Sequence, residues 1–420
     1  MDELNSSNSQ PRHPRAYVST MGIIQMHSRS PFVIAFWSAM FPGLGHMLLS
    51  KYIRGFLLFV WEVFINFESN VNLAILYSFT GRFEMAKSVI HKEWVLIYLP
   101  TYMFAIWDSF RSTVTINNLS KLAEREDAVI YPMKFNALGF NYLDKRTPWA
   151  AAVWCALTPG SGQLYLHRII GAFYILAWWI VTAYLSRLLP CIHYSLLGDF
   201  AKAKEVVNPH WFLNIPSIYM FSIYDAYINC VEVNKLFDWE QSKFLKRQYQ
   251  NRFFKIPSIK TRSDKMHIVS TFEYSNYLEL AITDIEMNGI PKENILAVPM
   301  DKRDEEIKLF DSMHHSDGLS LLDLPMILGT FFMIFGAIYG FVLKWGPLIW
   351  GLIASAIGFT IGLIIKIILT RKHSQRQKGI KSTEVVLVIE CEENQMHMVQ
   401  DTLWNNHALG VSKLDITGGK

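Results

Sequence analysis

Five ionisable residues lie within or at the ends of long apolar segments, and these are the side chains best placed to do chemistry. They are Asp108, Asp225, Glu62, Glu68 and Arg187. A charged group in such surroundings is costly unless it is paired or reaches water, so each is a candidate ion or proton site. The alternative for each is a structural or interfacial side chain.

The structural alternative is favoured for Asp108 and Asp225. Each ends a similar apolar segment, YMFAIWD in the first case and YMFSIYD in the second. A hydrogen bond to the Pro-Gly turn of the same half, or to Lys51, Arg54 or Arg168, would satisfy the carboxylate, and a feature present twice fits a structural bond. We expect each Asp to lie beside the turn of its own half.

The other three charges are arranged asymmetrically. Glu62 and Glu68 lie in an early apolar segment and Arg187 lies in a later one, so the two halves could set Glu against Arg. Segment ends and snorkelling explain Glu68 and Arg187 without a transport role.

No enzymatic activity, cofactor or metal site is expected. The sequence contains no phosphate loop, nucleophile elbow, HExxH or paired-cysteine motif. The four cysteines are far apart in the sequence, so neither a disulfide framework nor a zinc site is predicted. They are Cys155, Cys191, Cys230 and Cys391.

The composition is that of a membrane protein. Of 420 residues, 51% are hydrophobic and only 18% are charged, and the net charge is +4. The Lys and Arg residues form short clusters beside apolar segments instead of a continuous basic stripe, so the lipid bilayer, and not a nucleic acid, is the expected partner.

An internal repeat organises the first part of the chain. The segment from about 31 to 119 recurs from about 148 to 236, with PFVIAFWSAMFPGLGH aligned on PWAAAVWCALTPGSGQ and YSFTGRFEMAK on YSLLGDFAKAK. We expect two similar units packed about a pseudo-two-fold axis. Each unit has a short apolar stretch, a longer one (about 55 to 78 and 171 to 197) and a third (about 93 to 110 and 210 to 230). Only the last two have the roughly 20 residues that one spanning helix needs, so each is expected to form one long helix.

A Pro-Gly-x-Gly turn interrupts the short stretch of each unit. Proline removes an amide donor and glycine frees the backbone, so a helix should end there. Broken backbone at membrane depth must be covered, which favours a re-entrant or interfacial hairpin over a span. His46 could be pH-sensitive, although its counterpart Gln163 suggests plain hydrogen bonding. The turn residues are Pro42, Gly43, Gly45 and His46 in the first unit and Pro159, Gly160, Gly162 and Gln163 in the second.

The C-terminal part has the pattern of a split α+β domain. MHIVSTF, NILAVPM, EVVLVIECE and GVSKLDI read as strands, and a helix pattern follows the first and third of them. Two β-α-β halves predict a ferredoxin-like sandwich whose second and third strands are antiparallel neighbours, between which a membrane hairpin can be inserted. Both hairpin helices carry small residues four apart, for close helix packing: Gly336 and Gly340, and Gly358 and Gly362.

Two family resemblances follow from these motifs. The Pro-Gly-x-Gly-His/Gln turn with its later aromatic-Asp pair resembles small bacterial membrane modules that have a Pro-Gly-Leu-Gly-Gln signature. Residues 264–420 resemble a bacterial general-stress family in which a Gly-rich hairpin interrupts a ferredoxin-like domain. Neither resemblance implies an activity.

The predicted organisation is therefore a polytopic α-helical membrane protein with a cytoplasmic ferredoxin-like domain. We expect a polar tail (1–30), membrane repeats (31–122 and 148–238) around a cytoplasmic linker (123–147), a helical connector (239–263) and a split domain (264–420) with a membrane hairpin (322–369). A non-enzymatic scaffold or regulator that binds itself or a membrane partner is the first hypothesis. A small-solute or ion pathway between the repeats is the second.

The charge distribution predicts that the N-terminus, the linker and the ferredoxin-like domain face the cytoplasm. A single cysteine in place of Lys134, in a cysteine-free background, should react with a membrane-impermeant maleimide only after the cells are opened. Reaction in intact cells would contradict this topology.

Overall fold

The computed structural model describes residues 12–137, 139–250, 254, 265–300, 320–371 and 384–414, without the side chains of residues 265, 370 and 371. The chain divides into two compact units. Unit 1 comprises Met1–Tyr142, Arg146–Val231 and Lys308–His373, and unit 2 comprises Leu143–Lys145, Glu232–Ile307 and Ser374–Lys420. The hairpin and almost all of both halves therefore cluster in unit 1, while the rest of the split domain lies in unit 2 together with residues 143–145 and the end of the second half.

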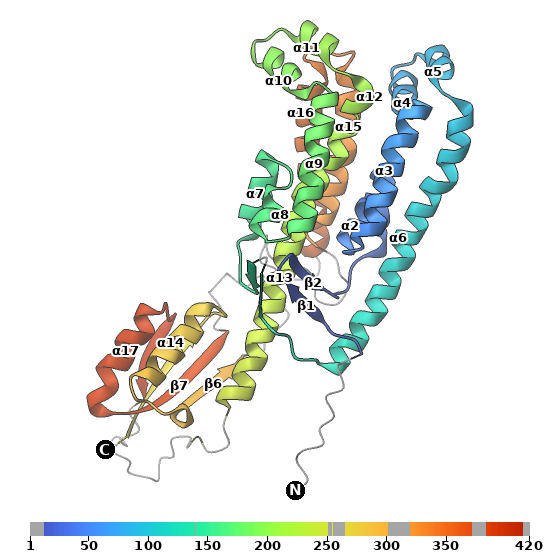
Figure 1. Cartoon of the computed structure of the whole chain (residues 1–420). Helices are drawn as coiled ribbons and strands as arrows, with labels where there is room; N and C mark the ends of the chain where they lie inside the picture. The colour runs from blue at the N-terminus through green and yellow to red at the C-terminus, as the bar shows by residue number, and fades with distance from the viewer. Residues whose placement is uncertain are drawn as a thin grey trace. The chain divides into compact units, whose positions relative to one another are not determined.

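The two halves of unit 1 form similar successions of helices, and the second half has one additional short helix, α12 (Pro209–Phe212), before its long last helix (Figure 1). The first half contains α1 (Pro31–Met40), α2 (Leu44–Leu48), α3 (Tyr52–Ser69), α4 (Val71–Phe79), α5 (Phe83–Val89) and α6 (Lys92–Glu126). The second contains α7 (Pro148–Leu157), α8 (Ser161–Tyr165), α9 (Ile169–Leu185), α10 (Leu188–Leu196), α11 (Phe200–Val206), α12 (Pro209–Phe212) and α13 (Ile215–Tyr249), which continues into unit 2.

The Pro-Gly turn ends the first helix of each half, as expected. Helix α1 stops at Met40, two residues before Pro42. Gly43 and Gly160 then take nearly identical left-handed conformations, with φ of 100° and 102°. A Cβ on Gly43 would lie 2.4 Å from the carbonyl oxygen of Gly55, so the turn also needs glycine for close backbone contact.

The expectation of one long helix over 55–78 and over 171–197 is wrong. In each half a residue in the left-handed conformation divides the stretch, Asn70 with φ of 55° and Arg187 with φ of 56°. Helices α9 and α10 are consequently bent by 64°. Apolar character alone did not reveal the break because neither position carries Gly or Pro.

Tertiary hydrogen bonds compensate for this break in both halves. The carbonyl of Ser69 accepts a hydrogen bond from the N–H of His91 (3.2 Å), and the carbonyl of Ser186 accepts one from the N–H of Asn208 (3.1 Å). Each bond connects the end of the broken helix to the segment that precedes the next long helix. It gives a partner to a carbonyl that has lost its hydrogen bond within the helix.

Two described helices are long and apolar enough to cross a membrane, α15 (Asp323–Gly340) and α16 (Gly346–Arg371, apolar through Leu369). A third span results if the bent α9–α10 pair is counted as one. Membrane insertion is therefore plausible, and the expected polytopic topology of the halves stays a prediction. Helices α1 and α7 are apolar but shorter.

Helices α15 and α16 approach each other at the four predicted glycines, Gly336, Gly340, Gly358 and Gly362. A Cβ on Gly336 would lie 2.4 Å from the carbonyl oxygen of Trp350, and one on Gly362 would lie 2.6 Å from Cα of Pro325. Any larger side chain would force the helices apart.

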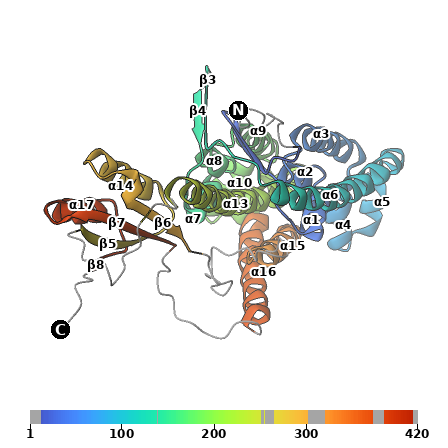
Figure 2. The ribbon, with the colours of Figure 1, turned by 90° about the horizontal axis from the view of Figure 1, so that it is seen from below.

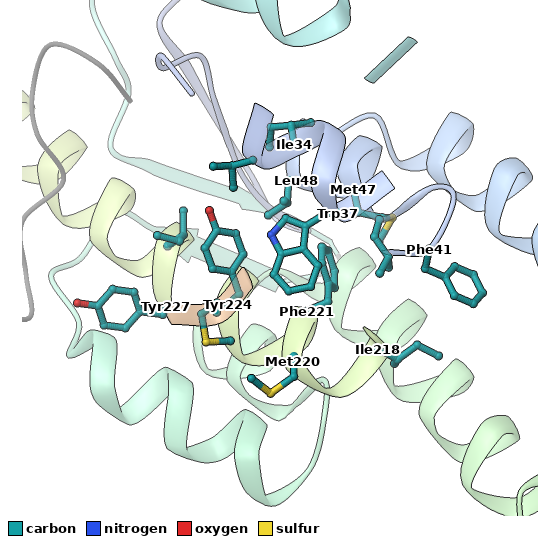
Figure 3. Close-up of a cluster of buried hydrophobic side chains, with 14 of the residues drawn as sticks. Ile34, Trp37, Phe41, Met47, Leu48, Ile218, Met220, Phe221, Tyr224 and Tyr227 are labelled. Atoms are coloured by element: carbon teal, nitrogen blue, oxygen red, sulfur yellow. The ribbon is translucent and has the colours of Figure 1, made fainter. Parts of the chain in front are cut away.

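A buried hydrophobic cluster contains side chains of both halves (Figure 3), and Leu322, Met326 and Met333 of the hairpin segment also belong to it. Trp37 is fully buried against Phe221 and Tyr224 of α13, with ring centroids 5.4 and 5.1 Å away. Its counterpart Trp154 is 51% exposed. The expected pseudo-two-fold packing therefore does not hold at this pair of residues.

Two β-hairpins of unit 1 were not predicted. Strands β1 (Ala16–Ser19) and β2 (Gly22–Gln25) pair in the segment expected to be a polar tail, and β3 (Met133–Asn136) and β4 (Gly139–Tyr142) pair in the segment expected to be a linker. Four-residue strands are too short for alternation to identify them.

Unit 2 contains a four-stranded antiparallel sheet with two helices. Its strands are β5 (Lys265–Phe272), β6 (Ile295–Pro299), β7 (Val385–Glu392) and β8 (Gly410–Leu414), in the order β6-β7-β5-β8. Helices α14 (Asn276–Met287) and α17 (Met396–Asn405) follow the first and third strands. The prediction that β6 and β7 are antiparallel neighbours is confirmed.

Unit 2 also includes the end of α13, which bonds to the start of α14. The amide of Gln241 donates to the carbonyl of Ser275 (2.9 Å) and to Glu279 Oε1 (2.7 Å). The expected separate connector (239–263) is thus, up to Tyr249, a continuation of α13.

Lys145 forms a second attachment within unit 2. Its ammonium lies 3.0 Å from Asp238 and 3.7 Å from Glu384. Burial alone would lower the pKa of Lys145, but these two carboxylates raise it above its usual value.

The sheet predicts that unit 2 folds without the hairpin. The N–H of Met300 donates to the carbonyl of Glu384 (2.8 Å), so a short turn can replace residues 301–383. A fragment of residues 232–300 and 384–420 joined by Asn-Gly should be soluble and show a cooperative thermal transition by circular dichroism. A fragment that starts at residue 265 serves as the control and should be less stable, because it lacks the α13 contacts. An unfolded longer fragment would contradict the interrupted-sheet fold.

Candidate functional site

The first half contains a carboxylate clamp, which we define as Asp108, His46 and Arg54. Asp108 Oδ2 accepts hydrogen bonds from His46 Nε2 (2.9 Å) and Arg54 Nη1 (2.8 Å). The Pro-Gly turn places His46 on α2, and α3 supplies Arg54. Asp108 on α6 therefore connects the turn and two helices of its own half, as expected.

The second half contains the corresponding clamp, Asp225, Gln163, Arg168 and Asn229. Asp225 Oδ2 accepts from Gln163 Nε2 (3.0 Å) and Arg168 Nη1 (2.7 Å), and Oδ1 accepts from Asn229 Nδ2 (2.8 Å). Arg168 also donates to the hydroxyl of Tyr52 in the first half (3.1 Å). The side chains that bond Asp225 and Arg168 all belong to unit 1.

The two clamps share their design but differ in solvent access. The Arg54 side chain is 52% exposed, whereas that of Arg168 is 5% exposed. An ion pair removed from water is more sensitive to loss of one partner, since the other charge stays buried and uncompensated. The second clamp is therefore the more critical for stability.

The environment of His46 favours a hydrogen-bonding role. Its side chain is fully buried, and Nδ1 has no hydrogen-bond partner among the described residues. A proton on Nδ1 would have no acceptor there, so a pH-sensitive role is disfavoured. Gln163, which cannot titrate, occupies the same place in the second half.

Glu62 belongs to a separate buried polar network, which we define as Glu62, Asn66, Asn72, Tyr98 and Asn214. Glu62 Oε1 accepts from Asn66 Nδ2 (3.3 Å) and the Tyr98 hydroxyl (3.1 Å). Asn66 also donates to Asn72 (3.3 Å), and Asn72 donates to Asn214 of the other half (3.0 Å). In the described part of the chain, no cation pairs with Glu62, and Asn66 Oδ1 has no partner.

The predicted arrangement, in which a Glu of the first half faces Arg187 of the second half, is not observed. No ion pair between Arg187 and either Glu62 or Glu68 occurs in the described residues. Arg187 is exposed at the start of α10, and Glu68 is half-buried near the end of α3. Both positions fit the helix-end interpretation.

A further buried acid, Asp323, was missed by sequence analysis. Its Oδ1 accepts from the Tyr224 hydroxyl (2.8 Å) and its Oδ2 from the N–H of Ser320 (2.7 Å). Because Asp323 begins α15, these bonds attach the hairpin to α13. The available signal was an acidic residue directly before an apolar run, which is the usual composition of a helix N-terminus.

No protein-family model matches the chain, and no curated protein or solved structure is significantly similar to it. The two resemblances inferred from the Pro-Gly turn and the Gly-rich hairpin therefore stay predictions.

The clamps predict a clear order of mutational effects. Replacing Asp225 with Ala should lower the free energy of unfolding by about 3–5 kcal/mol, because Arg168 stays buried without its partner. Replacing Asp108 with Ala should cost about 1–3 kcal/mol, because Arg54 can reach water. Unfolding in detergent micelles measures both.

The matched control is Glu84→Ala, which removes an exposed ion pair with Lys87 and should cost less than about 1 kcal/mol. Equal stability of the Asp225 and Glu84 variants would show that the clamp has no structural role.

Proposed function

We propose that this protein is a non-enzymatic membrane scaffold or regulator, with a ferredoxin-like domain that binds a partner or itself on the cytoplasmic side. The observation that carries this proposal is the carboxylate clamp of each half. Both Asp108 and Asp225 accept hydrogen bonds from side chains of the same half, so these repeated acids serve the fold instead of a ligand.

The sheet of unit 2 supports the ferredoxin-like assignment. Its order β6-β7-β5-β8 is that of two interleaved β-α-β units, each with a strand of the other between its own strands. The fold by itself does not define a ligand, since many functions use it.

The hydrophobic surroundings of the hairpin also support a structural role. A cavity of about 350 Å³ lies against α13, α15 and α16 and is lined mainly by apolar side chains such as Met220 and Phe359. Its three hydroxyl groups are already bonded, Tyr219 to the carbonyl of Ala156, Ser355 to Met220 Sδ and Thr360 to the carbonyl of Ala356. Such a lining is suited to hydrocarbon and offers little to a hydrated ion.

One observation favours the second candidate, a proton or cation pathway. The Glu62 network connects α3 to the second half. The carboxyl group of Glu62 is buried and has no cationic partner among the described residues. A buried carboxyl in this state holds either a proton or a bound cation.

A flux measurement separates the two candidates. The full chain is reconstituted into phosphatidylcholine and phosphatidylglycerol vesicles that contain a pH-sensitive dye, and a pH or K⁺ gradient is imposed. If the protein is a scaffold, vesicles that contain it should leak protons and K⁺ no faster than protein-free vesicles. Gramicidin serves as the positive control. Flux that Glu62→Gln abolishes and Glu84→Gln preserves would replace the scaffold with the pathway.

A further inference from the structure

The β3–β4 hairpin has one entirely apolar face. Its register pairs Met133 with Tyr142 and Phe135 with Phe140, which places all four side chains on the same face. Phe135 is 68% exposed and Phe140 is 56% exposed. The Phe135 and Phe140 rings stack, as do those of Phe140 and Tyr142, so the face is a continuous exposed aromatic surface.

The opposite face is polar and attached to the protein. It carries Lys134, Asn136 and Asn141. Asn136 Nδ2 donates to the Thr20 hydroxyl (2.9 Å), and Asn141 Nδ2 donates to the carbonyl of Ser19 (2.7 Å). The hairpin is therefore held by its polar face on the β1–β2 turn, and its apolar face is left uncovered by the described residues.

The β1–β2 turn is itself bound to the start of α9. The N–H of Ile169 donates to the carbonyl of Met21 (3.0 Å), and His167 Nε2 lies 3.1 Å from the carbonyl oxygen of Thr20. Helix α9 begins the bent candidate span, so the hairpin lies at the level where the chain would enter the bilayer. Figure 2 shows β3 and β4 extending sideways from the helices of unit 1.

We propose that the apolar face of the β3–β4 hairpin rests in the interfacial region of the lipid bilayer. Exposed aromatic rings are stabilised at the boundary between headgroups and acyl chains, where such residues are enriched in membrane proteins. The lipid-facing apolar surface also continues along α9. Its Ile170 and Phe173 are 49% and 65% exposed, directly beyond the residues to which the β1–β2 turn is bound. In water this face would be an aggregation-prone patch.

This inference rests on the proposed membrane insertion of unit 1, and depth-dependent quenching tests the two separately. The full chain, with its native cysteines replaced, carries one environment-sensitive fluorophore at Phe135→Cys, Phe140→Cys, Lys134→Cys or Ile357→Cys. It is reconstituted into phosphatidylcholine vesicles, with and without lipids that bear a doxyl quencher near the headgroup or near the end of the acyl chain. Iodide serves as the aqueous quencher.

Labels at positions 135 and 140 should be quenched by the shallow doxyl lipid and be about threefold less accessible to iodide than the label at position 134, which is on the polar face. The label at position 357, on exposed lipid-facing α16, should be quenched by the deep doxyl lipid. Two label positions on the apolar face guard against local disruption by either substitution.

Each other outcome overturns a specific statement. Loss of deep quenching at position 357 would refute membrane insertion itself. Normal quenching at 357 with free iodide access at 135 and 140 would refute only the interfacial hairpin. The labels at 135 and 140 could instead be protected from iodide and not quenched by either doxyl lipid. Together with a measurable distance between spin labels on two copies of the chain, this result would assign the face to a dimer contact and refute the lipid contact.

Discussion

The fold of unit 1 depends on a buried carboxylate in each half that joins the short helix after the Pro-Gly turn to the next helix and to the long last helix. The Pro-Gly turn ends α1 and leaves a short helix that has too few backbone hydrogen bonds to be stable alone. Asp108 and Asp225 hold this turn through His46 or Gln163, and an Arg of the next helix neutralises the charge. The acid, the turn and the Arg are therefore mutually dependent, because any one left buried without the others is costly.

The two halves reuse this design and differ where they contact the rest of the protein. The second clamp is buried and also bonds Tyr52 of the first half, whereas the first clamp is partly open to solvent. Trp37 packs into the shared core while Trp154 is exposed. Packing of α15 against the second half, through Asp323 and Tyr224, makes the environment of the halves unequal. Similar sequence thus produces similar local structure in different surroundings.

Several side chains became interpretable only through their neighbours. Three charged residues in apolar segments look equally unusual in the sequence. In the structure Asp108 is paired, Glu62 is buried without a cation among the described residues, and Arg187 is exposed at the start of a helix. The β3–β4 hairpin is likewise an ordinary linker in sequence, and its aromatic face is recognised only when the strand register is known.

The sequence by itself determined the repeat, the helix end at each Pro-Gly turn, the pairing of each Asp with its own turn, and the neighbouring β6 and β7 strands. These features are local or periodic, so residue type and spacing are enough to predict them. Only the tertiary structure decided the breaks at Asn70 and Arg187, the isolation of Glu62 from Arg187, and the buried Asp323. Each of these depends on contacts between segments far apart in the chain, such as the bond from His91 to Ser69, which no local pattern encodes.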